Sequence, residues 1–208
     1  MSDYLTDEEQ VARLRAWWER YGTMVAVAVV VVVAAIVGWR WYESSVAEKV
    51  ARGSELYEQF LAADGDARAS LLGLIESEAS GTAYVSFARL HLARALVDDG
   101  NLEAAEDQLR KALAAAPERE LADLIRLRLA RVLIGRDRQD DALAVLTEIR
   151  APGFRPQAAE LKGDIHMARN ERALAHEAYA AALAEVPDGT SRPLLELKVA
   201  DTADAAES

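Results

Sequence analysis

Between Arg20 and Arg40 the chain holds nineteen consecutive residues without a charge, YGTMVAVAVVVVVAAIVGW. A helix rises about 1.5 Å per residue, so this run would reach about 28 Å, close to the roughly 30 Å hydrocarbon core of a bilayer. Its valines would favour a strand in water, but in lipid a lone segment can satisfy its backbone only as a helix. The run therefore predicts a transmembrane helix, which we place at residues 21–42, after a short tail at residues 1–20.

Aromatic residues stand at both ends of this span. Amphipathic rings belong at the headgroup level of a membrane, whereas a buried core helix has no reason to gather its aromatics at its ends. The pattern therefore indicates a double aromatic belt. It contains all four tryptophans of the chain and two tyrosines: Trp17, Trp18 and Tyr21 before the run's apolar centre, and Trp39, Trp41 and Tyr42 after it.

The alternative to an anchor is a cleaved signal peptide. Such a peptide has a basic start, an apolar region of about 7–15 residues and a cleavage site of small residues. Here the start is mixed and acidic, the apolar stretch is longer, and bulky Trp39, Trp41 and Tyr42 occupy the expected cleavage region. We therefore expect the span to be retained.

The positive charges hardly decide the orientation of the span. Three basic residues lie near each end, so the positive-inside rule gives no clear answer. Arg40 lies at the interface, where its side chain can snorkel, and this favours an inside N-terminus only slightly. The residues counted are Arg13, Arg15 and Arg20 before the span, and Arg40, Lys49 and Arg52 after it.

Beyond residue 43 the chain is dominated by Ala and Leu, which favour helices, and β-branched and aromatic residues are scarce. The predicted fold class is therefore all-α. The chain has a net charge of −11, of which residues 41–208 carry −10, because residues 1–20 hold five acids and three arginines and Arg40 adds one positive charge. Such acidity should repel nucleic acid and anionic lipid surfaces. The absence of cysteine excludes disulfides and thiol catalysis.

Short breaks divide this part of the chain into helices of 12–18 residues, and three of the resulting helix pairs repeat one pattern. The pairs lie at residues 92–117, 129–149 and 161–187. Their equivalent small residues are 37 and 33 residues apart, close to the period of about 34 of the tetratricopeptide pattern, which these segments resemble. The expected breaks are residues 64–66, 80–81, 98–101, 117, 135–138, 152–156, 169–170 and 187–189.

Small residues at fixed positions should allow the two antiparallel helices of each pair to approach closely. Gly100, Asp137 and Asn170 fall in the equivalent turns of the three pairs. The predicted packing and turn positions are Ala93, Gly100, Ala105, Ala130, Ala142, Gly163, Ala175 and Tyr179.

The repeats predict an α-solenoid at residues 43–200. Its first part, residues 43–80, lacks the motif and should be an N-terminal cap or a degenerate repeat. Residues 192–201 should form a capping helix at the other end of the stack. The acidic tail at residues 201–208 has the composition of a disordered segment.

The inner face of such a solenoid comes from the first helix of each pair. Aligning the units makes Arg94 and Arg131 equivalent, within a mixed apolar and polar channel. This channel would capture an extended peptide or a partner helix, with arginine binding carboxylates or backbone carbonyls. Alternatively, the helix at 192–201 or the helix after the anchor fills it. The channel residues are Phe87, Leu90, Arg94 and Val97, then Leu124, Leu127, Arg131 and Ile134, then Gln157, Glu160, Asp164 and Met167.

No motif points to catalysis or to a cofactor. His91, His166 and His176 lack the spacing of a metal site, and we expect them to pack or to be solvated. Gly163 and Asp164 fall inside a predicted helix, where the glycine serves close packing rather than a phosphate loop. We therefore expect a protein without enzymatic activity, cofactor or metal.

Taken together, these features resemble the YfgM-like family of ancillary SecYEG translocon subunits. The resemblance covers nearly the whole chain and is more specific than the repeats alone. It is carried by the placement of the anchor and by GSELYEQFL (53–61), TAYVSFARLHLARALVDDGNLEAAEDQL (82–109), LIRLRLARVL (124–133), AELKGDIHMARN (159–170) and LLELKVADTA (194–203).

The resemblance implies a single-pass protein of the bacterial inner membrane, with a cytoplasmic N-terminus and a periplasmic repeat domain. It also implies association with SecYEG and with the membrane-anchored periplasmic chaperone PpiD, and a role in passing emerging proteins to periplasmic chaperones. It carries over no catalytic site. The alternative is a tetratricopeptide scaffold for another cell-envelope assembly machine.

Overall fold

The structure is a computed structural model that describes residues 7–186 and 190–203. Within these ranges it contains helices and no strand, which confirms the all-α prediction. It divides into two compact units, one up to Glu48 and one from Lys49 onward. The helices are α1 (Asp7–Ala62), α2 (Gly65–Glu78), α3 (Ala83–Asp98), α4 (Leu102–Ala115), α5 (Arg119–Gly135), α6 (Gln139–Thr147), the 3₁₀ turn η1 (Pro152–Phe154), α7 (Arg155–Ala168), α8 (Arg172–Ala184) and α9 (Pro193–Thr202).

The first unit consists of the greater part of α1. Among the described residues, α1 is the helix that is long and apolar enough to cross a membrane. Side chains along its apolar run are exposed, Val30 and Val37 among them, as a lipid-facing helix requires. At one end the rings of Trp17 and Tyr21 lie 5.9 Å apart. The helix does not stop at residue 42 but continues without a break to Ala62, past the boundary between the two units.

The second unit starts with a helix pair that lacks the repeat motif. Buried apolar side chains from the end of α1, from α2 and from the start of α3 form one cluster. Gly53 permits this packing, because a β-carbon there would lie 2.6 Å from Tyr84 Cδ2 and 2.9 Å from Ala79 Cβ. The cluster contains Leu56, Phe60, Ile75, Ala79, Val85 and Ala88.

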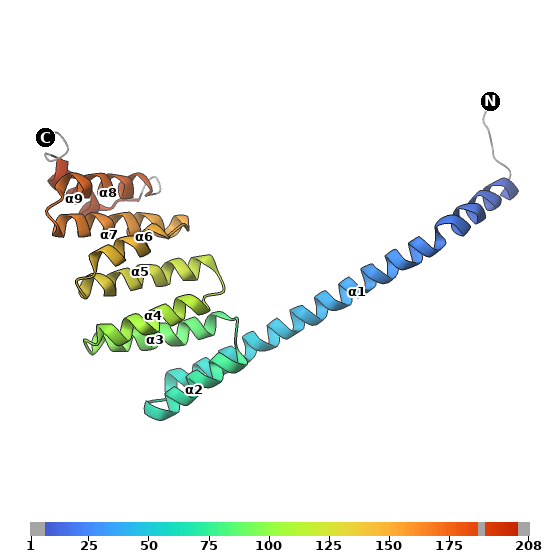
Figure 1. The fold of residues 1–208 in the computed structure, drawn as a ribbon, viewed down its shortest axis with the longest axis horizontal. Coiled ribbons are helices and arrows are strands. Elements are labelled where there is room, and N and C mark those ends of the chain that lie inside the picture. Colours follow the sequence, from blue (N-terminus) through green and yellow to red (C-terminus); the bar gives the residue numbers. More distant parts are fainter. Residues whose placement is uncertain (1–6, 187–189, 204–208) are drawn as a thin grey trace. The chain divides into compact units, whose positions relative to one another are not determined.

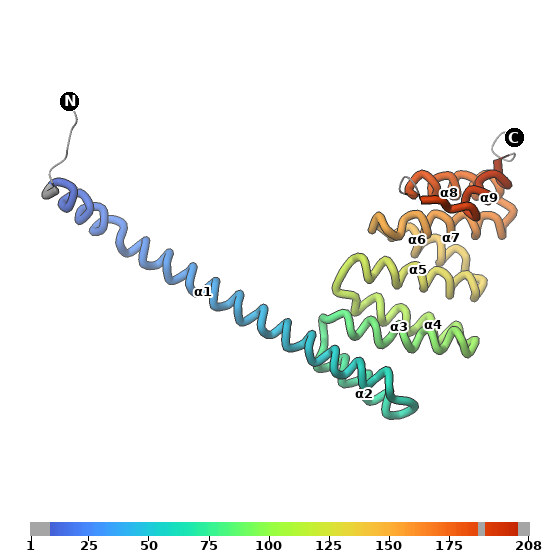
Figure 2. The backbone as a smooth tube through the Cα atoms, turned by 180° about the vertical axis from the view of Figure 1, so that it is seen from behind, coloured from blue at the N-terminus to red at the C-terminus, as the bar shows by residue number. Residues whose placement is uncertain are grey.

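Three antiparallel helix pairs follow, α3 with α4, α5 with α6 and α7 with α8, stacked in chain order (Figure 1). The largest buried cluster runs from α3 through α7 and centres on α5. Figure 2 shows α9 beside α8, beyond α7, where Leu195 is buried against the last pair. α9 continues to Thr202, two residues past the expected end of the solenoid at residue 200, and Thr202 is buried. The expected break at 187–189 and residues 204–208 lie outside the described residues.

The three turns within the pairs have the same backbone conformation. Gly100, Asp137 and Asn170 have φ angles of 75°, 58° and 59°, the left-handed conformation in which helices commonly end. The next N–H in each turn donates back to a carbonyl five residues earlier, which closes the helix in the same way three times. These bonds join Asn101 to Leu96 (2.8 Å), Arg138 to Leu133 (2.9 Å) and Glu171 to His166 (2.9 Å).

The positions expected to be small lie between helices. Gly163 faces the ring of Tyr179, and a β-carbon on this glycine would overlap that ring. The break expected at residues 152–156, between the second and third pairs, contains η1. The alanines, all buried, are Ala93, Ala105, Ala130, Ala142 and Ala175.

Candidate partner-binding groove

Two neighbouring hollows lie between α3 and α5, each of about 270 Å³. Leu90, Arg94 and Arg128 line both hollows, so the two are continuous, and we call them together the α3–α5 groove. The first hollow is also lined by Ala93, Val97, Leu109, Arg131 and Val132, and the second by Tyr57, Phe87, His91 and Leu124.

Aromatic rings form one wall of the second hollow. The ring centre of Tyr57 lies 6.2 Å from that of Phe87 and 5.9 Å from that of Tyr84, and the rings of His91 and Phe60 form a T-shaped pair with centres 5.7 Å apart. Partial burial raises the pKa of Tyr57, so this phenol stays neutral at physiological pH. Phe87 is 37% exposed, so part of this residue is accessible to an occupant.

Among the residues that the structure describes, three arginines and no carboxylate line the groove. The nearest carboxylate partner of Arg94 is Asp98, at 3.8 Å, and the Arg94 side chain is 83% exposed. Arg128 and Arg131 are exposed and form no ion pair or hydrogen bond within the described part of the chain. The groove is therefore a positively charged site in a protein with a net charge of −11.

Six of the predicted channel residues line this groove: Phe87, Leu90, Arg94, Val97, Leu124 and Arg131. Two others do not. Leu127 is 3% exposed and belongs to the core, and Ile134 packs against the same core. Arg128 was missed, although the alignment that pairs Arg94 with Arg131 also pairs His91 with Arg128.

Three of the four predicted channel residues of the third pair, Glu160, Asp164 and Met167, lie against the protein's own helix α9 or the cluster around it. Lys198 of α9 donates to Glu160 Oε1 at 2.8 Å and to Asp164 Oδ1 at 2.7 Å. Met167 packs against the cluster that contains Leu195. Helix α9 thus contacts α7 on the predicted inner face, while the groove between α3 and α5 is hollow.

Opposite charges and hydrogen bonds connect α9 to α7 and α8. Burial lowers the pKa of Lys198, but its hydrogen bonds to Asp164 and Glu160 outweigh this effect, and the net pKa is raised. Tyr179 Oη also donates to Asp164 Oδ1, at 2.8 Å, and the Lys198 ammonium lies 5.3 Å from the centre of the Tyr179 ring. Burial and the bond to Asp164 raise the pKa of Tyr179. These contacts tie α7, α8 and α9 together.

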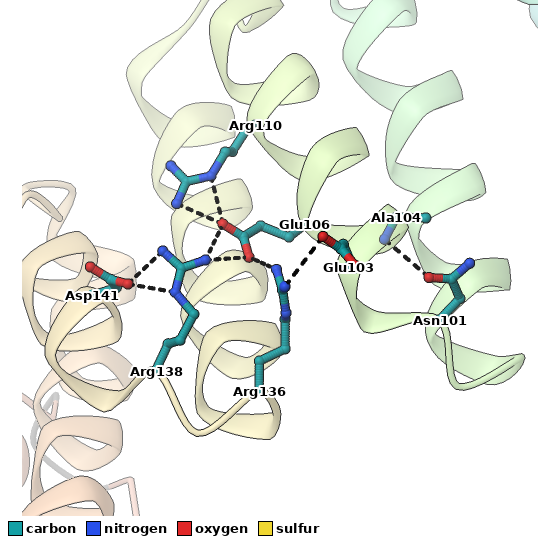
Figure 3. A network of polar contacts seen from close by, with 8 residues as sticks. All are labelled: Asn101, Glu103, Ala104, Glu106, Arg110, Arg136, Arg138 and Asp141. Atoms are coloured by element: carbon teal, nitrogen blue, oxygen red, sulfur yellow. Dashed lines mark hydrogen bonds and ion pairs between the residues drawn. The ribbon is translucent and has the colours of Figure 1, made fainter.

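A buried carboxylate fixes α4 to the turn after α5 and so holds one side of the groove. Glu106 is 5% exposed and accepts hydrogen bonds from Arg110, Arg136 and Arg138 (Figure 3). The Arg138–Glu106 distance is 2.8 Å, and Arg138 continues to Asp141 of α6. Burial raises the pKa of Glu106, but its bonds to Arg110 and Arg138 outweigh burial and the net pKa is lowered.

A second buried carboxylate fixes α5 to the segment that leads into α7. Asp123 Oδ2 accepts the backbone N–H groups of Arg150 at 2.9 Å and Ala151 at 2.7 Å, and Oδ1 accepts from Arg126 at 2.8 Å. Burial opposes the charge of Asp123, but these bonds prevail and its pKa is lowered. With Glu106, this residue holds α5 between its two neighbours.

Comparison with known proteins agrees with this architecture. The family model described as tetratricopeptide repeat-like domain matches residues 15–204. The chain is 28% identical over 182 residues to the ancillary SecYEG translocon subunit of Haemophilus influenzae, which covers 86% of this chain and 89% of that protein.

Two further relatives carry the same name. The protein of Escherichia coli K12 is 27% identical over 201 residues, covering 96% of this chain and 98% of the relative. That of Neisseria gonorrhoeae is 23% identical over 206 residues, with the same coverage. The stacked helix pairs, their repeated turns and the match over residues 15–204 lead to one conclusion: the chain belongs to the tetratricopeptide repeat-like domain family.

Proposed function

We propose that this chain is a membrane-anchored ancillary subunit of the SecYEG translocon that works by binding other proteins and not by catalysis. The observation that carries the proposal is the similarity along nearly the whole chain to proteins of that name. An apolar helix suited to anchoring and an open groove suited to a protein ligand support the same role.

The proposal extends to orientation and partners. The N-terminus lies in the cytoplasm and the repeat unit in the periplasm of a bacterial inner membrane, where the unit links translocated proteins to chaperones such as PpiD. The acidity of the repeat unit supports binding to proteins, because it disfavours nucleic acid and anionic lipid surfaces. A scaffold of another envelope assembly machine is the competing function.

Co-purification tests the partner. Full-length chain in mild detergent should retain SecY and PpiD, and the double variant Arg94→Glu/Arg131→Glu should lose at least one of them while its helical circular dichroism stays unchanged. Arg119→Glu is the matched control, because Arg119 is an exposed arginine that lies outside the groove and has no ion pair with any described residue. Absence of both proteins from the wild-type complex would favour the scaffold function.

A fusion tests the orientation. A reporter that is active only in the periplasm, joined after Ser208, should be active. A fluorescent reporter that matures only in the cytoplasm, joined at the same position, should not fluoresce. The reverse pair of results would place the repeat unit on the cytoplasmic side.

A further inference from the structure

We infer that the α3–α5 groove binds an acidic segment of a partner protein, in which carboxylates stand beside apolar side chains. Arg94, Arg128 and Arg131 supply the cations, and the two hollows receive the apolar side chains. This inference rests on the proposed function of the groove as a partner-binding surface, and it adds the chemical class of the ligand.

The first argument is the state of the arginines. Most arginines of the second unit bind a carboxylate of their own chain, as Arg126 binds Asp123 at 2.8 Å and Arg138 binds Glu106 at 2.8 Å. Within the described residues, Arg128 and Arg131 have no such partner, and Arg94 has only a loose one. Three guanidinium groups around one groove therefore keep their donors available.

The second argument is a comparison within the molecule. Another hollow, at the start of α5, also holds three arginines: Arg119, Arg126 and Arg150. Three carboxylates share its lining, those of Glu118, Asp123 and Glu148, so its charge is balanced. The α3–α5 groove has three cations and no lining acid, so its charge is left for a ligand to neutralise.

The third argument concerns size. Each hollow here has about 270 Å³ and is mostly apolar, which suits single side chains. An extended segment presents alternate side chains to one face, so neighbouring hollows can take two of them. Guanidinium groups on the rim then pair with carboxylates at the other positions, where their planar forks match carboxylate geometry.

An acidic peptide fits this surface better than a membrane or a nucleic acid. Residues 41–208 carry a net −10, which repels extended anionic surfaces. A peptide brings only a few carboxylates, and it brings them next to the arginines on the rim of the groove. At physiological ionic strength, interactions between exposed charges are screened over about 8 Å. The electrostatic potential that acts on a peptide in the groove therefore comes mainly from the groove arginines.

The probe is a synthetic fluorescent peptide of about ten residues in which Asp alternates with Leu, tested against full-length chain in zwitterionic detergent by anisotropy. A peptide with Asn in place of Asp is the matched comparison. The aspartate peptide should bind about tenfold more tightly or better, because the contributions of several exposed charge pairs add up. Rising salt concentration should weaken binding of the aspartate peptide.

Variants locate the effect. Arg128→Gln should weaken binding of the aspartate peptide about two- to fivefold, and Arg94→Gln/Arg128→Gln/Arg131→Gln about tenfold or more. Arg119→Gln should change nothing, although it removes an equally unpaired arginine. Because these side chains are exposed, unchanged helical circular dichroism is expected for all of them.

Several results would overturn the inference. The aspartate and asparagine peptides could bind equally well, and both could lose binding in Phe87→Ala. This would mean that the groove binds partners without recognising carboxylates, and the proposed function would stand. A preference for aspartate that survives the triple variant would place the acidic ligand elsewhere. Competition by short-chain phosphatidylglycerol as strong as that by the peptide would assign the cations to lipid headgroups. Normal co-purification of SecY and PpiD with Arg94→Glu/Arg131→Glu would instead count against the groove part of the proposed function.

Discussion

The ring of Tyr179 on α8 lies against the backbone of Gly163 on α7, where a β-carbon would overlap the ring. The hydroxyl of the same tyrosine donates to Asp164 Oδ1 at 2.8 Å, which fixes the position of the ring along α7. The closest approach of the third helix pair is therefore set by the absence of one side chain and by one hydrogen bond.

Gly163→Ala should lower the free energy of unfolding by about 1–3 kcal/mol, because the added methyl group overpacks a contact that holds the ring in place. Gly73→Ala is the control. Gly73 also lies inside a helix, but nothing stands within 4 Å of its β-carbon position, so alanine should stabilise α2 by up to about 1 kcal/mol. Urea unfolding followed by circular dichroism measures both, and equal effects of the two substitutions would contradict this packing.

The repeat alanines should resist enlargement. Ala105, Ala142 and Ala175 are fully buried, so leucine at any one of them should cost about 1–3 kcal/mol of unfolding free energy. Exposed alanines on the same helices serve as controls: Ala114 on α4, Ala144 on α6 and Ala181 on α8. Thermal unfolding measures the difference, and three unchanged melting temperatures at the buried positions would refute the repeat register.

The repeat could be found from sequence because its signals are local. Small residues recur near the expected period, and Gly100, Asp137 and Asn170 mark turns by their own backbone preferences. The groove was harder to predict, because exposure depends on neighbours. Leu90 and Leu127 occupy equivalent positions and both are buried in the same core cluster, yet Leu90 also lines the groove and Leu127 does not. The cover that α9 provides depends on Lys198 meeting Glu160 and Asp164, a contact that no single-helix pattern contains.

The three left-handed turn residues give a comparison between backbone and side chain. Gly100→Ala should destabilise the domain by about 1–2 kcal/mol, since a β-carbon is strained at a φ of 75°. Asn170→Gly, at a φ of 59°, should cost little or add stability, because glycine adopts this conformation without strain. Urea midpoints of the two variants provide the measurement, and a larger loss in Asn170→Gly than in Gly100→Ala would mean that the Asn170 side chain has a role of its own.

The Glu106 cluster should make stability depend on pH. The folded-state pKa of Glu106 lies below its ordinary 4.5, so its contribution is fully present above that value and is lost as the pH falls through the lower folded pKa. Glu106→Gln should therefore cost about 1–3 kcal/mol at neutral pH, and the difference from wild type should shrink at acidic pH. Urea unfolding across that pH range tests the sign.

Glu103→Gln is the matched control for this experiment. Glu103 lies one turn earlier on α4 with its side chain 86% exposed, and it approaches Arg136 only to 3.8 Å. Its replacement should change stability by a few tenths of a kcal/mol at most. A Glu103→Gln effect as large as that of Glu106→Gln would mean that general surface charge, and not the buried cluster, governs the acid response.

α5 has a position that no other repeat helix shares. Its side chains enter the core toward both neighbouring pairs. Asp123 accepts a hydrogen bond from the backbone of Arg150, on the way to α7, and Arg136 in the turn after α5 donates to Glu106 of α4. In a linear array, amide protons exchange first where a helix has one neighbour and last where it has two. Hydrogen exchange should therefore be slowest along α5 and faster along α9. The groove borders this slowest-exchanging helix, so it can keep its shape while the C-terminal helices open and close.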